Sequence, residues 1–303
     1  MFAMLEAQRL EMCKWLQRTD PSPLHNRACS LYEPGTGDWM LRSPAWANWI
    51  DVKQRCIWVH GIPGAGKTIL MSHLGEQIRK HCCKLQRFAY AYYYCYFGHS
   101  QDESVPFLGS LLSQLCRQSN TITPQIHEMY RNGGEPSLIK LLKALEETLD
   151  HFNTVYVTID ALDESSPRIN LLKVLRDLVT DARFQKIQLL SSSREYIDIE
   201  DAMETISTGV SMSNPYVEED IRCHVRSLLS SNPRFKKWPK DILDEVEDAV
   251  TIGAKGMYVL KFPQTIYSGT LVEMQLQSVV VFYVHGVRGS FHTNHRTSVI
   301  TYC

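Results

Sequence analysis

The sequence has no long hydrophobic run and no excess of charge of either sign. Its purely apolar stretches, such as residues 279–284, are far shorter than the ~20 residues that a membrane-spanning helix needs. The 32 Lys and Arg nearly balance the 33 Asp and Glu, which gives a net charge of -1. This balance excludes nucleic-acid binding by bulk positive charge, so we expect neither a membrane nor a nucleic acid as partner.

Paired cysteines are also missing. The nine cysteines are odd in number and are scattered without a CxxC pair. In a chain of 303 residues, which is long enough to fold around its own core, this pattern is typical of reduced thiols. We therefore expect an intracellular protein and place it in the cytoplasm.

From residue 56 onward, short apolar strands alternate with amphipathic helices. Strands are expected over residues 56–60, 88–97, 154–160 and 186–190. Apolar strands separated by helices predict an α/β fold, with a parallel sheet covered by helices on both faces. Strands are expected to stop after about residue 212, and helical patterns then follow over residues 217–229 and 242–250.

Residues 61–68 match the motif GxxxxGK[ST], between a predicted strand and a predicted helix. Its glycines let successive backbone amides point at a phosphate, and the following helix directs its positive end at the same anion. Lys67 is expected to contact the β- and γ-phosphates, and Thr68 to coordinate Mg²⁺. The predicted nucleotide-binding residues are Gly61, Ile62, Pro63, Gly64, Ala65, Gly66, Lys67, Thr68 and Ile69.

Acidic residues follow the third predicted strand. Asp160 is expected to hold Mg²⁺ together with Thr68. Asp163 and Glu164 come next on the loop, and either could orient or deprotonate an attacking water, with a slight preference for Glu164. Arg194, which follows a run of serines after the fourth strand, is expected to bind the γ-phosphate. The plainer alternatives are solvated loop acids and a surface ion pair.

Several other motifs are absent. The sequence lacks [NT]KxD, which argues against a Ras-type GTPase and favours ATP or ADP. It also lacks the GxSxG and HExxH signatures of two hydrolase classes. Three histidines lie close together near the C-terminus, but a metal site there is not favoured: His285, His292 and His295.

Together these residues resemble the fungal NACHT-type signalling NTPases of the STAND class. The NTPase region is similar to the nephrocystin-3-like N-terminal module. The resemblance covers about residues 10–260, including residues 35–41, 61–68, 110–115, 160–164, 193–194 and 256–258. It implies ATP/ADP and Mg²⁺ as ligands, a switch between a closed ADP form and an open, oligomerising ATP form, and a role in fungal incompatibility. It also implies that Thr36 and Trp39 lie near the adenine.

The sequence departs from the usual plan of these relatives, which carry an N-terminal effector domain, a winged-helix part and C-terminal repeats. We expect neither an effector domain before residue 10 nor repeats after the NTPase. The expected parts are a helical and linker segment (1–50), the P-loop NTPase domain (51–210), a short, truncated helical subdomain (211–262) and an irregular tail (263–303). The tail contains one acidic residue, Glu273. It is either an aberrant gene-model product or a real β-rich extension.

Two functions fit these observations. The first is an ATP-binding signalling switch with slow hydrolysis, which associates with itself or with other signalling proteins. The alternative is a non-catalytic nucleotide-binding or assembly fragment. A small-molecule P-loop kinase fits less well, because we find neither a lid nor a substrate-binding arginine cluster.

Overall fold

The computed structural model describes residues 2–233, 235–254, 256 and 257, with side chains from residue 6 onward. The chain divides into two compact units, one ending at Val217 and one beginning at Glu218.

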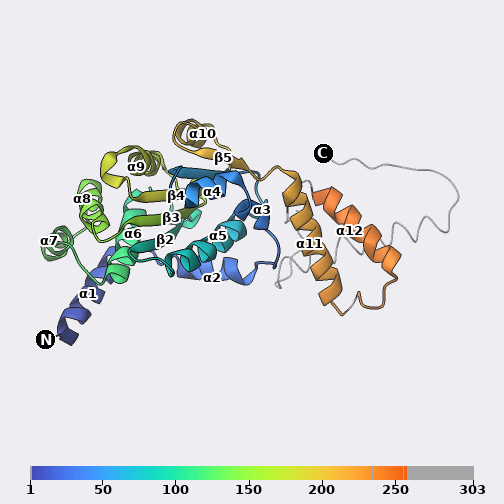
Figure 1. The fold of residues 1–303 in the computed structure, drawn as a ribbon, viewed down its shortest axis with the longest axis horizontal. Helices are drawn as coiled ribbons and strands as arrows, with labels where there is room; N and C mark the ends of the chain where they lie inside the picture. Colours follow the sequence, from blue (N-terminus) through green and yellow to red (C-terminus); the bar gives the residue numbers. More distant parts are fainter. Residues whose placement is uncertain (1, 234, 255, 258–303) are drawn as a thin grey trace. The chain divides into compact units, whose positions relative to one another are not determined.

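The first unit is built on a five-stranded sheet in which every neighbouring pair of strands is parallel (Figure 1). The strand order is β2-β3-β4-β1-β5. The two central strands β3 and β4 are buried along their whole length, which explains their nearly continuous apolar sequences. The α/β fold class is therefore confirmed. The strands are β1 (Cys56–His60), β2 (Phe88–Tyr94), β3 (Thr154–Asp160), β4 (Ile187–Ser193) and β5 (Thr208–Ser211).

Two strand predictions need correction. The second strand ends at Tyr94, and the 3₁₀ turn η1 (Phe97–His99) follows, so the prediction that it extends to Phe97 was wrong. The fifth strand, β5, was missed. It has four residues, half of them exposed, and it pairs only with β1. A short edge strand carries too little hydrophobic patterning to be recognised from sequence.

Helices cover both faces of the sheet. On one face, α4 (Pro44–Ile50) and α5 (Lys67–Cys82) contact the strands, and α2 (Ser22–Ser30) packs on α5. On the other face, α6, α8, α9 and the N-terminal α1 enclose the main hydrophobic core, which includes Leu108, Val157 and Leu189. The bounds on this side are α1 (Phe2–Leu16), α6 (Ser104–Ser119), α8 (Leu138–Leu149) and α9 (Ile169–Thr180). The shorter elements are α3 (Asp38–Leu41), α7 (Pro124–Asn132), η2 (Leu162–Glu164), η3 (Ala182–Phe184) and α10 (Ile197–Met203).

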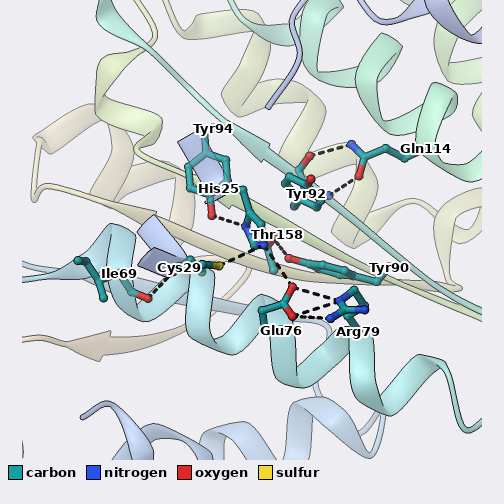
Figure 2. Close-up of polar contacts among 11 residues, drawn as sticks. His25, Cys29, Ile69, Glu76, Arg79, Tyr90, Tyr92, Tyr94, Gln114 and Thr158 are labelled. Carbon is teal, nitrogen blue, oxygen red and sulfur yellow. Dashed lines mark hydrogen bonds and ion pairs between the residues drawn. The ribbon is translucent and has the colours of Figure 1, made fainter. Parts of the chain in front are cut away.

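His25 connects the N-terminal segment to the sheet and to α5 (Figure 2). Its buried ring lies with Nδ1 2.9 Å from the Tyr94 hydroxyl and Nε2 3.3 Å from Glu76 Oε1. Glu76 also binds Arg79 one turn further along α5. Because these bonds join α2, α5 and β2, the segment before the P-loop is part of the same packed unit.

The second unit contains most of α11 (Pro215–Ser231) and all of α12 (Lys240–Ala254). Buried Glu247 of α12 accepts two hydrogen bonds from Arg226 of α11, at 2.6 and 3.0 Å. The predicted tail at 263–303 lies outside the described residues, as do His285, His292 and His295. Across the described part of the chain, no helix combines the length and the apolar character that crossing a membrane requires.

Candidate functional site

The strand order brings three sequence motifs to one edge of the sheet. In that order β4 lies between β1 and β3. The glycine-rich loop follows β1, Asp160 ends β3, and Ser193 ends β4. Because the strands are parallel, their carboxyl ends meet at the same edge, which is where open α/β sheets bind ligands.

The loop at residues 61–68 has the backbone of a phosphate-binding loop. Gly64 and Gly66 have φ angles of 78° and 83°, in the left-handed region that favours glycine. Gly66 is the N-cap of α5, and no side chain caps the first amides of this helix. These amides are therefore directed at the space above the loop, where an anion would satisfy them.

Exposure varies along the loop. Ile62, Pro63 and Gly64 are exposed, whereas Ala65 is buried. Thr68 is exposed, and Ile69 is half-buried with its carbonyl bonded to the Ser72 hydroxyl. The predicted binding residues thus form a loop and the first turn of α5, with Ile62, Pro63, Gly64 and Thr68 exposed and Ala65 packed inward.

Lys67 folds back over this loop. Its Nζ donates hydrogen bonds to the carbonyl oxygens of Gly61 at 2.7 Å and Ile62 at 3.0 Å. Burial lowers the pKa of Lys67, and the nearby carboxylates of Asp163 and Asp160 oppose this shift. The ammonium group therefore lies among the loop carbonyls and within electrostatic reach of both acids.

Asp160 is almost completely buried, with 3% of its surface exposed. The hydroxyl of Ser192 donates a hydrogen bond to its carboxylate, and the Thr68 hydroxyl lies near the same carboxylate. Burial raises the pKa of Asp160, while the two hydroxyls and the charge of Lys67 lower it. The next residue, Ala161, has a φ of 60°, an uncommon conformation for a residue with a side chain. Its amide donates a hydrogen bond to Ser192 Oγ at 3.2 Å. The Ser192 hydroxyl is therefore bonded to two successive residues, Asp160 and Ala161.

The Asp163 carboxylate binds Arg194, and the Asp163 carbonyl accepts a hydrogen bond from Arg168 Nη1 at 2.7 Å. Its Oδ1 accepts from the Arg194 amide at 3.0 Å, and its Oδ2 lies 3.1 Å from the Arg194 Nε. Only 5% of the Asp163 side chain is exposed, compared with 43% for Arg194. The structure therefore brings the two residues together as an ion pair, in which the guanidinium keeps an open side.

Of the two acids on the loop after β3, Glu164 makes fewer contacts than Asp163. Its Oε2 accepts one hydrogen bond, from the Phe97 amide at 3.3 Å. Burial raises the pKa of Glu164; the Phe97 amide lowers it, and the neighbouring acids Asp163 and Asp160 raise it again. A half-buried carboxylate with a raised pKa at a ligand edge has the character of a general base.

Sequence reasoning missed the role of Ser192. The three serines before Arg194 are all fully buried, but they have different partners. Ser191 bonds to the Ile57 carbonyl and Ser193 accepts from the Trp58 indole, so only Ser192 reaches Asp160. Side chains alternate between the two faces of a sheet, so residues 190 and 192 point to the face opposite that of residue 191. This alternation was the sequence signal that distinguishes Ser192 from its neighbour Ser191.

The segment before the P-loop packs against α5. Gly37, with a φ of 74°, approaches so closely that a Cβ there would lie 2.8 Å from Leu70 Cδ1. Thr36 is buried, and its hydroxyl donates to the Glu33 carbonyl at 2.8 Å. The half-buried indole of Trp39 is stacked with Tyr216, with a centroid distance of 6.2 Å.

The donor set at this edge suits Mg²⁺ better than a transition metal. Within the described residues, no group of three or more His, Cys, Asp and Glu side chains could hold a metal ion. Thr68 and Asp160 instead supply two adjacent oxygen groups. Mg²⁺ is commonly bound by one or two such protein oxygens, with water and phosphate completing its shell.

Several solved structures are distantly similar to this chain. Orc1 of Aeropyrum pernix, solved in complex with DNA, has a TM-score of 0.49 at 12% identity, covering 82% of this chain and 64% of that chain. The Walker-type ATPase of Pyrococcus abyssi has a TM-score of 0.48 at 12% identity, covering 86% of this chain and 74% of that chain. Likenesses this distant carry no argument about function.

Sequence comparison is more specific. The chain is 25% identical over 238 residues to the vegetative incompatibility protein HET-E-1 of Podospora anserina, covering 73% of this chain and 17% of that protein. It thus spans less than a fifth of the length of this relative. Residues 35–194, more than half of the chain, match the family described as nephrocystin 3, N-terminal. The matched region includes the P-loop, Asp160 and Arg194. The chain therefore belongs to the nephrocystin 3, N-terminal family and is a NACHT-like P-loop NTPase module of the nucleotide-binding kind.

Proposed function

We propose that the chain is a signalling switch module that binds Mg·ATP through its P-loop and hydrolyses it slowly. The observation that carries this proposal is that the Thr68 hydroxyl and the Lys67 ammonium both lie near the Asp160 carboxylate. This arrangement brings the glycine-rich loop next to the buried acid at the end of β3. A phosphate-binding loop and a carboxylate thus lie close enough to share one magnesium-bound phosphate.

In this proposal the phosphates lie on the loop at residues 61–68. Lys67 exchanges the carbonyls of Gly61 and Ile62 for phosphate oxygens, which are stronger acceptors because they carry charge. Thr68 and Asp160 would hold Mg²⁺, which when bound supplies positive charge against the β- and γ-phosphates. Without a cation the buried Asp160 carboxylate is costly, as its raised pKa indicates.

The adenine would lie beside the segment that precedes β1. Trp39 and Tyr216 present stacked aromatic faces, and Tyr216 is 60% exposed. Buried Thr36 uses its hydroxyl within its own turn, so it would shape this pocket through the backbone. Aromatic side chains stack on any nucleobase, so these two rings do not distinguish ATP from GTP. The choice of ATP therefore rests on the absence of the guanine-reading motif [NT]KxD from the sequence.

Hydrolysis would use Glu164 and Arg194. The half-buried Glu164 can orient and deprotonate the attacking water, because the Phe97 amide fixes one of its oxygens and leaves the other free of any described partner. Arg194 would contact the γ-phosphate through its exposed side while Asp163 holds its Nε. Asp163 then acts by positioning Arg194.

One observation favours the second candidate, a non-catalytic nucleotide-binding or assembly module. The guanidinium that would stabilise the transition state is already paired with Asp163. If this pair persists with nucleotide bound, Arg194 contributes little charge to the phosphate, and turnover would be negligible. In that case the module responds to nucleotide occupancy alone.

The partners and the location are part of the same proposal. The relative HET-E-1 is a vegetative incompatibility protein, which supports a signalling role with self-association or with other signalling proteins. The eight cysteines within the described residues are all free, which supports a reducing compartment such as the cytoplasm.

Phosphate release from the purified chain tests the proposal and separates the two candidates. Slow release of phosphate from Mg·ATP is expected, falling by about 10² in Glu164→Gln if this carboxylate is the base. Glu128→Gln, at an exposed position, is the matched control and should leave the rate unchanged. Nucleotide binding without any phosphate release would favour the assembly module, and absence of binding would refute both.

A further inference from the structure

Glu103 is a fully buried acid that none of the recognised motifs contains. It precedes α6 and has no exposed surface. Its carboxylate accepts a hydrogen bond from the Tyr93 hydroxyl, and its Oε1 lies 2.7 Å from His99 Nδ1. A buried carboxylate costs several kcal/mol unless it is well bonded, so such a residue calls for a physical explanation.

The main chain of Glu103 binds a different loop. Its amide donates to Ser165 Oγ at 3.2 Å, and the Ser165 hydroxyl in turn donates to the Pro167 carbonyl at 3.0 Å. Ser165 is buried and directly follows Glu164. One residue therefore binds η1 through its carboxylate and the loop after β3 through its backbone.

The η1 turn is the element that contacts Glu164. The amide of Phe97, at the start of η1, donates to Glu164 Oε2 at 3.3 Å. His99, at the end of the same three-residue turn, is the residue bonded to the Glu103 carboxylate. Fixing His99 therefore fixes the direction of the Phe97 amide.

Asp102 makes a parallel connection. Its Oδ1 accepts from the Ser104 amide at 2.9 Å and its Oδ2 from the Asn170 amide at 3.1 Å. One carboxylate thus caps the starts of α6 and α9. The loop before α6 is bonded to the loop after β3 at several points, and Glu103 is the most deeply buried of them.

We propose that Glu103 is a positioning residue that holds Glu164 in the orientation needed to direct a water molecule at the γ-phosphate. This inference rests on the proposed hydrolysis. Glu103 touches no nucleotide in this scheme, so its loss should slow the chemical step and leave nucleotide binding intact. Misplacing a catalytic group by about 1 Å can lower a rate by roughly 10²-fold.

Two variants test the proposal, because one of them preserves the buried volume and the other changes a partly exposed side chain. Glu103→Gln keeps the shape and removes the charge, and His99→Ala removes the partner whose side chain is 29% exposed. In both, kcat should fall by about 10-fold or more while KM stays within about twofold. Glu247→Gln is the matched control, because Glu247 is a buried, arginine-bonded acid of the second unit.

Amide hydrogen exchange supplies a readout that does not depend on turnover. We expect exchange of residues 97–99 to become about 10-fold faster in Glu103→Gln and His99→Ala, and to be unchanged in Glu247→Gln. Unchanged exchange in both variants would overturn the proposal, and so would an equal loss of kcat in Glu247→Gln. If the parent chain releases no phosphate, the proposed hydrolysis fails, and the exchange experiment still decides whether Glu103 fixes the amide that holds Glu164.

Discussion

The Thr68 hydroxyl lies near the Asp160 carboxylate and lowers its pKa, which brings the first turn of α5 next to the end of β3. The two residues are 92 positions apart in the sequence. Their proximity follows from the strand order, because β4 is the only strand between β1 and β3. A hydroxyl, a carboxylate and the Lys67 ammonium therefore lie close to one another at this edge of the sheet.

Ser192 should act through Asp160. Ser192→Ala removes a donor to the carboxylate, and outer partners of metal ligands typically change metal affinity by about 10-fold to 100-fold. We expect ATP affinity to fall by about 10-fold in the presence of Mg²⁺ and to be unchanged in EDTA, measured by calorimetry. Ser191→Ala is the control, because Ser191 bonds to the Ile57 carbonyl instead. Equal losses with and without Mg²⁺ would contradict this role.

Arg194 should distinguish a triphosphate from a diphosphate. Arg194→Ala should weaken binding of a non-hydrolysable ATP analogue by about 10-fold, since hydrogen bonds to charged groups are worth roughly 1.5–3 kcal/mol. ADP affinity should stay the same, because ADP has no γ-phosphate. The control is Arg183→Ala, which removes an exposed arginine paired with Asp181. A similar loss of ADP affinity in Arg194→Ala would show that this residue has another role.

The pH dependence of turnover should report Glu164. Burial raises the pKa of Glu164, so its ionised form is lost as the pH falls through a range above that of an exposed glutamate. A general base works only when ionised, and kcat should therefore decrease at mildly acidic pH. The residual activity of Glu164→Gln should lack this step. An identical acid limb in the parent and in the variant would assign the titration to a different group.

Gly75 allows α5 to pack on the sheet. A Cβ at this position would overlap the Tyr90 hydroxyl and lie 3.2 Å from Tyr90 Cζ, and that hydroxyl is bonded to Thr158. Gly75→Ala should lower the free energy of unfolding by about 1–3 kcal/mol, measured by urea denaturation. Gly253→Ala in α12 meets nothing within 4 Å and should be neutral or slightly stabilising. Tyr90→Phe combined with Gly75→Ala should recover part of the loss; no recovery would disprove the overlap.

The P-loop and the central strands could be predicted because their signals are local. Residues 61–68 carry a complete motif, and β3 is apolar along its length because both of its faces are covered. The edge strand β5 could not be predicted, since its four residues, two exposed and two half-buried, carry no clear periodicity. The β2 prediction failed at its end because the aromatic run continues past Tyr94 into η1, where hydrophobicity no longer indicates a strand.

Pairings within the site were harder to foresee than its location. Asp163, Glu164 and Arg194 were selected by position, but the ion pair between Asp163 and Arg194 depends on how two loops meet in space. The roles of Ser192 and Glu103 depend on side-chain direction and on burial, which a single sequence encodes only weakly. Such contacts are long-range properties of the fold, whereas motifs are properties of neighbouring residues.

Calorimetric titration of Mg·ATP into the purified chain tests the central claim most directly. The account predicts saturable binding to the parent and to Lys84→Ala, which alters an exposed lysine just beyond α5. It predicts no detectable binding to Lys67→Ala, because the ammonium that lies over the loop is then missing. Equal binding by Lys67→Ala and the parent would contradict the claim that this loop holds the phosphates.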